Sequence, residues 1–327
     1  MFGRIRVGIM GTGAIARKMA ATIKHTRGLS LYAVGSREQE TAESFASELK
    51  CKKAYGSYEA LVQDGKVDLV YVATPNSAHY DCAKLALNNG KPVLVEKPFM
   101  LNEKQAQEIL DLGKEKGLFV QEAMWTRFLP LAAEMQEVIA SGLIGDVRSL
   151  TAHICAPIAD KQRIADPALG GGALLDMGVY VLTFASLFFG DEVSDIASLA
   201  SKNSLGADEQ TGILLRYADG KVASLTCTAL TPGKHEGVIY GSGGYLVTDG
   251  ITSFKSFSVY DNHGKRILRK RAKKHKDGYS YELLASASAL REQKAECEQM
   301  SHESTLKIMN MMDFIRKQIR VSYPGEE

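Results

Sequence analysis

The chain has 327 residues, of which 45% are hydrophobic, 24% charged and 8% aromatic, and its formal net charge is +2. The length indicates two domains, and the composition excludes a disordered chain, a collagen-like chain and a small disulfide scaffold. A nucleic-acid-binding domain would be far more basic. The N-terminus leads directly into an expected strand, and the most apolar stretch, 179–189, is shorter than the roughly 18 residues of a spanning helix. We therefore expect a soluble, cytoplasmic protein with neither nucleic acid nor a membrane as a partner.

The five cysteines are widely spaced and form no CxxC pair. Their odd number and their spacing argue against a disulfide framework and against a zinc site. We expect no bound metal, and reduced thiols at Cys51, Cys82, Cys155, Cys227 and Cys297.

The first third of the chain alternates between apolar runs and helical patterns. The apolar runs predict strands at residues 5–10, 29–34, 68–73, 92–96 and 118–121. Helical periodicity predicts helices at residues 14–26, 37–50, 78–89 and 103–116. Strands that alternate with helices of this length indicate βαβ units, so we expect an α/β domain with a parallel sheet over residues 1–123.

The pattern changes after about Met124. Helical periodicity predicts helices at residues 132–141, 173–188, 281–298 and 304–320. Period-two alternation predicts strands at residues 195–201, 209–217, 221–230, 236–240, 245–248 and 254–260. We therefore expect a second, α+β domain over residues 124–327, with an open and mostly antiparallel sheet.

Residues 11–16 read Gly-Thr-Gly-Ala-Ile-Ala, a GxGxxA pattern between an expected strand and an expected helix. Gly11 would make the tight turn, Gly13 would let the backbone approach a pyrophosphate, and Ala16 would allow close packing of helix on strand. The helix N-terminus, at Ala14 and Ile15, would offer N–H groups to the anion. This context predicts a dinucleotide site; the alternative is a glycine-rich turn that binds nothing.

The end of the second strand selects the cofactor in such sites, because an acidic residue there binds the ribose 2′-hydroxyl of NAD. This chain has Ser36 and Arg37 at that place. Arg37 can pair with a 2′-phosphate and stack on adenine, and Ser36 can donate a hydrogen bond. We therefore expect NADP rather than NAD. The alternative is that Arg37 is a solvated residue at a helix start.

Two further segments carry candidate catalytic side chains. Lys97, in the sequence Glu-Lys-Pro, ends an expected strand at the sheet edge where ligands of open α/β sheets bind. Asp176 and Tyr180 are four residues apart, so they share a face of an expected helix. A positive charge beside a tyrosine lowers its pKa, which makes a tyrosine next to a lysine a proton carrier. From spacing alone, a surface lysine and a structural Asp/Tyr pair are the commoner interpretations.

Four segments in this order carry a family resemblance: 11–16, 73–79 (Ala-Thr-Pro-Asn-Ser-Ala-His), 96–98 and 170–180. Through them the chain resembles the glucose–fructose oxidoreductase / inositol dehydrogenase / MocA (Gfo/Idh/MocA) family of NAD(P)-dependent oxidoreductases, over essentially its whole length. Segments 55–59 and 122–128 narrow the resemblance to the branch of dimeric dihydrodiol dehydrogenase and NADP-dependent D-xylose dehydrogenase. Tyr180 is also typical of that branch, since most of the family has a histidine there.

The resemblance implies a Rossmann domain followed by an α+β domain whose open sheet pairs two subunits. It implies that Lys97 and Tyr180 act in catalysis, with Asp176 on the substrate or holding the catalytic groups. Residues that it places along the cofactor are Thr74, Pro75, Asn76, His79, Glu96 and Lys97, with Trp125 and Arg127 towards the nicotinamide. From the residues alone, His79 would be a helix-start residue and Trp125 a core aromatic.

The resemblance also implies a substrate site that includes Trp125, Ile154, Asp176 and Tyr180. Dihydrodiol dehydrogenases carry an aromatic residue where this chain has Ile154, so a sugar or polyol becomes a better expectation than an aromatic dihydrodiol. The function predicted is hydride transfer between NADP and a sugar, polyol or trans-dihydrodiol-type substrate. The alternative is a non-catalytic sensor of nucleotides or sugars on the same fold, and Lys97 together with Tyr180 argues against it.

Two local expectations complete the sequence analysis. The resemblance implies a cis Lys97–Pro98 peptide, since the family uses this turn to aim the lysine, and the tertiary amide lowers the cost of that isomer. Eight of the twelve residues from Lys265 to Lys276 are Lys or Arg. We expect a solvated loop or hairpin there rather than a polyanion site.

Overall fold

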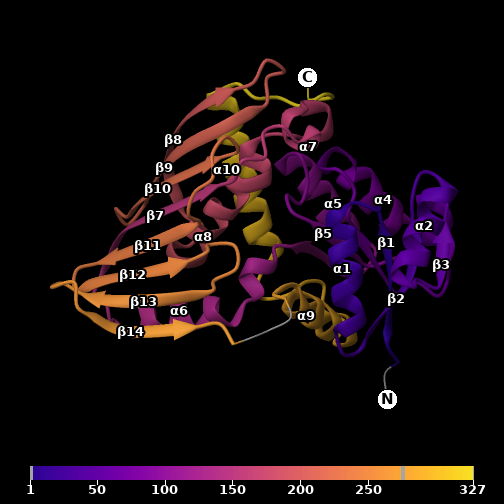
Figure 1. Ribbon diagram of the computed structural model, residues 1–327, viewed down its shortest axis with the longest axis horizontal. Helices are drawn as coiled ribbons and strands as arrows, with labels where there is room; N and C mark the ends of the chain where they lie inside the picture. The colour runs from indigo at the N-terminus through magenta and orange to yellow at the C-terminus, as the bar shows by residue number, and fades with distance from the viewer. Residues whose placement is uncertain (1–2, 274–276, 327) are drawn as a thin grey trace. The chain divides into compact units, whose positions relative to one another are not determined.

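The computed structural model describes residues 3–273 and 277–326, and the chain divides into two compact units (Figure 1). Unit 1 combines residues 1–125 with 277–306, and unit 2 combines 126–276 with 307–327. The first crossing between the units lies two residues from the expected boundary at 123/124. Residues 277–306 differ from the expectation, because the chain returns to unit 1 there.

The return is explained by contacts with the first domain. The hydroxyl of Thr22 donates to Asp277 at 2.8 Å, and the guanidinium of Arg291 donates to the carbonyl of Gly28 at 3.1 Å. The amide side chain of Gln121 accepts the N–H of Cys297 at 2.7 Å. The two residues of each contact are more than 170 positions apart in the chain, so the local periodicity of the sequence could not predict these contacts.

Unit 1 contains a six-stranded sheet in the order β3-β2-β1-β4-β5-β6, and all its strand pairs are parallel, which confirms the expected parallel sheet. Its strands are β1 (Ile5–Met10), β2 (Leu29–Gly35), β3 (Lys53–Tyr55), β4 (Leu69–Val72), β5 (Val93–Glu96) and β6 (Val120–Ala123). Its helices are α1 (Ala14–His25), α2 (Gln39–Leu49), α3 (Tyr58–Gln63), the 3₁₀ turn η1 (Asn76–Ala78), α4 (His79–Asn88), α5 (Glu103–Glu115) and α9 (Tyr279–Arg291). β4 and β5 are buried along their whole lengths, because helices cover both faces of a parallel sheet.

Two elements of unit 1 were not expected from the sequence, namely β3 and α3. A strand of three residues and a helix of six are too short to show a period. The start of α3 does have a local signal, because the hydroxyl of Ser57 accepts the N–H of Ala60 at 3.1 Å and caps the helix.

Unit 2 contains an eight-stranded sheet in the order β14-β13-β12-β11-β7-β10-β9-β8. Its strands are β7 (Val147–Cys155), β8 (Val193–Lys202), β9 (Asp208–Tyr217), β10 (Val222–Thr228), β11 (Glu236–Gly241), β12 (Gly244–Asp249), β13 (Ser256–Asp261) and β14 (Arg266–Arg271). All neighbours are antiparallel except β7 and β10, which run parallel. The expected open and mostly antiparallel sheet is therefore confirmed.

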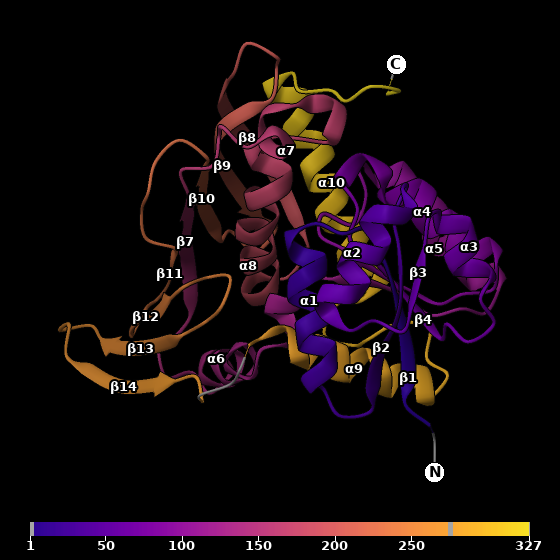
Figure 2. The ribbon, with the colours of Figure 1, turned by 45° about the vertical axis from the view of Figure 1, so that its right-hand side comes forward.

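Helices cover one face of this sheet. They are η2 (Trp125–Phe128), α6 (Pro130–Ala140), α7 (Gln162–Ala165), η3 (Pro167–Leu169), the π-helical turn η4 (Leu174–Gly178), α8 (Val179–Phe189) and α10 (His302–Ile319), of which η2 and α10 cross between the units. Figure 2 shows the sheet nearly edge-on, with α8 and α10 on one side of it. Within the described residues, the other side carries no helix.

The central strand β7 was missed by the sequence analysis. Its buried residues Leu150, Ala152 and Ile154 alternate with half-exposed ones, which is the pattern of a strand with one covered face. The strand preference of this segment is mixed, because Thr151 favours a strand and Ala152 does not. Pairing with β10 and β11 on its two sides, rather than propensity, makes this segment a strand.

The basic run forms an edge strand. β14 pairs with β13 in a hairpin, as expected, and its side chains are largely exposed; residues 274–276 of the run lie outside the described residues. Lys and Arg on an edge strand oppose pairing with another chain. Lys270 also forms an ion pair with Glu134 of α6 at 3.0 Å.

The apolar segment around 179–189 is longer than the sequence analysis supposed. In the described part of the chain, one helical stretch, Pro167–Phe189, has the length and hydropathy of a membrane span, and 78% of its apolar window is buried inside the protein. Such burial is typical of a core helix. Its neighbours are the sheet strands β7 and β10.

Candidate functional site

The turn after β1 is open towards solvent. Gly11 has φ +105°, and a Cβ there would lie 2.5 Å from the carbonyl oxygen of Ala73. Gly13 is exposed, and a Cβ there would have no described heavy atom within 4 Å. Ala14 is exposed and Ile15 half-buried, no acid stands in the first turn of α1, and no described side chain caps it. The first N–H groups of α1 therefore suit a pyrophosphate, as the GxGxxA pattern predicts.

The end of β2 lies beside this turn, since the N–H of Gly11 donates to the carbonyl of Gly35 at 3.0 Å. Ser36 is buried, and its N–H donates to Tyr55. Arg37 is exposed and forms no ion pair with any residue that the structure describes. A guanidinium placed there fits a 2′-phosphate.

The loop after β4 is tied to the loop after β5 by His79. The ring is 1% exposed, with Nδ1 2.9 Å from the carbonyl of Pro98 and Nε2 3.1 Å from the carbonyl of Thr74. Burial lowers the pKa of His79, so the ring is neutral and donates to one carbonyl at a time. We interpret His79 as a positioning residue, while the exposed Pro75 and half-buried Asn76 remain candidate cofactor contacts.

Lys97 is placed at the carboxyl end of β5, half-buried, and the Lys97–Pro98 bond is cis as expected. The carboxyl ends of β1, β4 and β5 meet at one edge of the parallel sheet, so unit 1 brings together the Gly11 turn, the Thr74 loop and Lys97. Glu96 lies just below, buried, and accepts the hydroxyl of Tyr71.

A second buried carboxyl faces this region from α9. Glu282 is 0% exposed, and within the described part of the chain neither of its oxygens has a hydrogen-bond partner. Burial, and then the negative charges of Glu96 and Asp277, raise the pKa of Glu282 well above its ordinary value. The surroundings of Glu282 therefore favour its protonated, neutral form. Sequence reasoning missed it and Tyr71, since neither stands in a motif.

Trp125 lies in unit 1 and stacks on Tyr279, with ring centroids 4.5 Å apart and an interplanar angle of 22°. Lys18 of α1 lies 5.9 Å above the Tyr279 ring and pairs with Asp277 at 3.6 Å. The half-buried indole is thus held by the start of α9. Its contact with the nicotinamide stays a prediction.

In unit 2, Asp176 lies in the π-helical turn η4 and Tyr180 in α8, which continues it. π turns inside helices are frequent at functional sites. Arg163 of α7, which stands in no sequence motif, pairs with Asp176 at 2.7 Å. Asp176 is 14% exposed and Arg163 52%. Arg163 is therefore a further candidate for the substrate side of this site.

The other two predicted residues of unit 2 are Ile154, on the covered face of the sheet, and Arg127, which binds α8. Ile154 is 4% exposed in β7, on the face beneath α8. The guanidinium of Arg127 donates to the hydroxyl of Ser186 in α8, and Ser186 donates to Asp191. Their predicted contacts with substrate and cofactor remain predictions.

All five cysteines are free in the structure. In the described part of the chain, no group of three or more His, Cys, Asp or Glu side chains is arranged to hold a metal ion.

Two family models match the chain. Residues 5–124 match the oxidoreductase family with an NAD-binding Rossmann fold (GFO_IDH_MocA), and residues 132–247 match the GFO/IDH/MocA C-terminal domain. The chain belongs to the Gfo/Idh/MocA family. The expected family and fold class are thereby confirmed.

Named relatives of this Gfo/Idh/MocA protein include two trans-1,2-dihydrobenzene-1,2-diol dehydrogenases. The one from Mus musculus is 34% identical over 227 residues, 68% of each chain. The one from Xenopus tropicalis is 29% identical over 325 residues, 97% of this chain and 98% of the relative. The protein is therefore an NAD(P)-dependent oxidoreductase, and this supports the catalytic interpretation over the sensor.

Solved structures share the whole fold. A 3-ketoreductase from Actinomadura kijaniata, in complex with NADP and TDP-benzene, is 25% identical with a TM-score of 0.89, covering 98% of this chain and 99% of its own. An aldose–aldose oxidoreductase from Caulobacter crescentus, 22% identical with a TM-score of 0.87 over 97% and 98% of the two chains, shows the same fold.

Proposed function

We propose that this oxidoreductase transfers a hydride between NADP and a hydroxyl-bearing carbon of a sugar, polyol or trans-dihydrodiol. The observation that carries the proposal is the position of Lys97, at the same sheet edge as the open Gly11–Gly13 turn. A dinucleotide whose pyrophosphate lay on that turn would extend along this edge. A cationic side chain there would stabilise negative charge on the reacting oxygen of a substrate.

NADP is the proposed cofactor because Arg37 stands at the position where an NAD enzyme has an acidic residue. Arg37 is exposed and forms no ion pair with an acid that the structure describes. The Actinomadura kijaniata 3-ketoreductase, 25% identical, is also bound to NADP. The bound nicotinamide accepts or gives the hydride.

The residues of this chain would handle the proton and the charge. During oxidation, the deprotonated Tyr180 oxygen takes the proton of the substrate hydroxyl, and Lys97 stabilises the alkoxide that forms. During reduction, Tyr180 returns the proton to the carbonyl oxygen. Asp176, paired with Arg163, would orient a second hydroxyl of the substrate. Such a second hydroxyl exists in sugars, polyols and vicinal diols alike.

The decisive test replaces the Tyr180 hydroxyl. Tyr180→Phe should lower kcat by about 10²–10⁴, the usual contribution of a general acid–base group, with the Kd for NADPH unchanged. Tyr217→Phe is the matched control, since its buried hydroxyl has no hydrogen-bond partner among the described residues. The assay follows NADPH absorbance with trans-1,2-dihydrobenzene-1,2-diol, D-xylose and other aldoses.

Lys97→Ala should lose a comparable factor, and the double variant should be far from additive if the two groups act as a unit. Retention of more than about a tenth of wild-type turnover by Tyr180→Phe would contradict the assignment. Asp176 would then be the candidate proton carrier.

We also propose a homodimer through the uncovered face of the eight-stranded sheet. Tyr240, Tyr245 and Tyr260 line up there across β11, β12 and β13, with the last two rings stacked at 5.0 Å. Leu199 and Leu214 are 84% and 52% exposed on β8 and β9. Apolar groups on an open sheet face favour a partner. Light scattering should give a dimer, or a multiple of one, at micromolar concentration; a monomer would contradict the proposal.

We also propose a cytoplasmic location, because all five cysteines are free thiols.

A further inference from the structure

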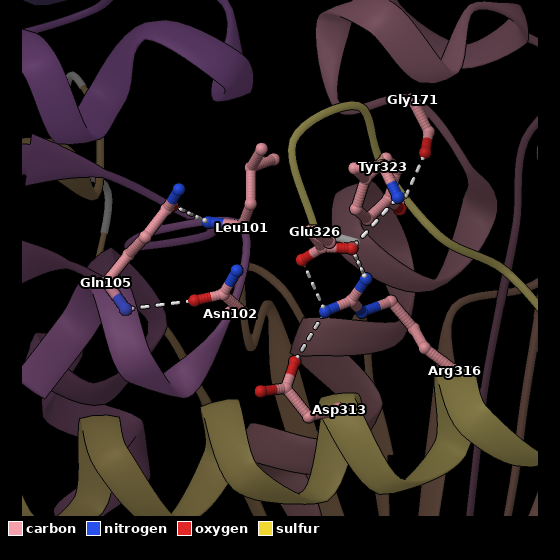
Figure 3. Close-up of polar contacts among 8 residues, drawn as sticks. All are labelled: Leu101, Asn102, Gln105, Gly171, Asp313, Arg316, Tyr323 and Glu326. Atoms are coloured by element: carbon pink, nitrogen blue, oxygen red, sulfur yellow. Dashed lines mark hydrogen bonds and ion pairs between the residues drawn. The ribbon is translucent and has the colours of Figure 1, made fainter.

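The segment that follows α10 is fastened by one buried arginine. The Arg316 side chain is 7% exposed, and its two terminal nitrogens bind the Glu326 carboxylate at 2.6 and 3.0 Å (Figure 3). Its Nη2 also donates to Asp313 one helical turn earlier, at 2.7 Å. A bidentate pair of this kind fixes direction as well as distance. Residues 321–326 are thus folded back onto α10.

Tyr323 lies inside this fold-back. Its N–H donates to Glu326 at 2.9 Å, and Arg316 lies 4.9 Å above its ring. The ring is 3% exposed, and its hydroxyl donates to the carbonyl of Gly171 at 2.8 Å (Figure 3). A residue near the C-terminus therefore binds the backbone of a loop 152 positions earlier.

Other parts of the chain pack closely against that loop. A Cβ at Gly171 would lie 2.6 Å from the carbonyl oxygens of Asp166 and Ile164. Gly172 has φ +123°, and a Cβ there would lie 2.3 Å from Oδ1 of Asp208. The backbone is therefore enclosed between residues 164–166, Asp208 and the Tyr323 hydroxyl.

The next residues begin the helix that holds Asp176 and Tyr180. Asp208, 1% exposed, accepts the N–H of Leu174 at 2.7 Å and the hydroxyl of Thr211 at 2.8 Å. Leu174 is the first residue of η4, and the N–H of Asp176 donates to the carbonyl of Gly172 at 3.3 Å. A shift of the glycine loop is thus passed directly to Asp176 and on to Tyr180.

We propose that Tyr323, held by Arg316 and Glu326, is a positioning residue that sets the Asp176–Tyr180 helix for catalysis. The inference rests on the proposed function, since it acts through Tyr180. The other interpretation is that the C-terminal segment only covers apolar surface. The two differ in what the Tyr323 hydroxyl does, because the ring alone would provide the cover.

Tyr323→Phe separates the two interpretations, since it removes one hydroxyl and keeps the ring against Arg316. We expect kcat to fall about tenfold, because a displacement of about 1 Å in a catalytic group costs up to 10²-fold. The KM for NADP and the Kd for NADPH should stay within about twofold of wild type, since the dinucleotide turn lies in unit 1. Tyr217→Phe, also a buried tyrosine of unit 2, should behave as wild type. Glu326→Gln should also lower kcat, by a smaller factor than Tyr323→Phe.

Hydrogen–deuterium exchange of the full-length protein with NADPH provides a readout that needs no substrate. Tyr323→Phe should speed exchange in the peptide 170–178 and leave 11–18 unchanged, and Tyr217→Phe should change neither. In a Tyr180→Phe background, adding Tyr323→Phe should cost less turnover than it does in the wild type, because one of the two groups that it positions is gone.

Each outcome decides. Wild-type turnover and exchange in Tyr323→Phe, beside a disabled Tyr180→Phe, overturn this inference and leave the proposed function standing. Equal losses in Tyr323→Phe and Tyr217→Phe also overturn it, since any buried hydroxyl would then do. A fully active Tyr180→Phe overturns the proposed function itself, and with it a catalytic role for Tyr323.

Discussion

This protein has two glycine-rich loops, 11–13 in unit 1 and 170–172 in unit 2, and each leads into a helix. The loops differ in whether the protein itself binds the first N–H groups of that helix. Around Gly13 an added methyl group would meet no described atom, and no described side chain caps α1. Around Gly172 the carboxylate of Asp208 fills that space and accepts the N–H of Leu174. The first loop leaves its donors for a ligand, and the second satisfies them within the protein.

The difference shows that glycine in a loop before a helix has two separate uses. At Gly13 it keeps a surface clear for an anion. At Gly171 and Gly172 it lets other parts of the chain pack against the backbone itself. Substitutions should therefore affect binding in the first loop and folding in the second.

The largest expected effect is that of Gly172→Ala. The new methyl would lie 2.3 Å from Asp208 Oδ1 at a φ of +123°, so it combines a clash with backbone strain. We expect a loss of about 3 kcal/mol in the free energy of unfolding, measured by urea denaturation. A variant as stable as wild type would show that the second loop is not enclosed.

Arg37→Asp tests the cofactor side of the open loop. It replaces the expected attraction to the 2′-phosphate with repulsion, so the Kd for NADPH should rise roughly 10- to 100-fold, as loss of a charge-assisted bond implies. The Kd for NADH should change little. Arg27→Asp, an exposed residue before the opposite end of β2, is the charge-matched control. Tighter binding of NADH than of NADPH by the wild type would refute the NADP assignment.

Gly13→Ala is the counterpart of Gly172→Ala. Gly13 has φ −72°, which alanine adopts without strain, so the free energy of unfolding should stay within about 0.5 kcal/mol of wild type. Affinity for NADPH should fall about tenfold, because the methyl stands where the pyrophosphate approaches. Fluorescence titration measures it. Unchanged affinity would place the pyrophosphate elsewhere.

Asp208→Asn should give the smallest effect and a pH signature. Burial raises the pKa of Asp208 above its ordinary value, against the hydrogen bonds from Thr211 and Leu174, which lower it. The folded protein therefore keeps a proton that the unfolded chain releases above pH of about 4. Wild-type stability is complete below that pH and declines as pH rises through the folded pKa.

The asparagine variant lacks this titration. Its stability relative to wild type should therefore increase with pH above about 4 and then level off. The increase should be about 1.4 kcal/mol for each tenfold difference in proton affinity between the folded and unfolded states of Asp208. Urea denaturation between pH 4 and 8 measures the difference. A pH-independent difference would mean that Asp208 is ionised in the folded protein.

Much of unit 1 could be predicted because its signals are local. The GxGxxA turn, the apolar runs of the strands and the period of the helices each lie within about 15 residues, and these elements appear close to where the patterns placed them. The cis bond at Lys97–Pro98 was expected from the family resemblance carried by residues 96–98. In unit 2, the alternation of apolar and polar residues along the strands likewise indicated which face of the sheet is covered.

The sequence alone determined the family, the plan of a Rossmann domain followed by an α+β domain, and the identity of the candidate groups Lys97, Asp176 and Tyr180. The tertiary structure decided the rest: that β7 is a central strand, that residues 277–306 join unit 1, and that Arg163 pairs with Asp176. The tertiary structure also decided the hydrogen bond from the Tyr323 hydroxyl to the carbonyl of Gly171, since the two residues are 152 positions apart in the chain. A period or a turn motif records contacts between near neighbours in the chain, whereas these arrangements depend on which distant surfaces the folded core brings together.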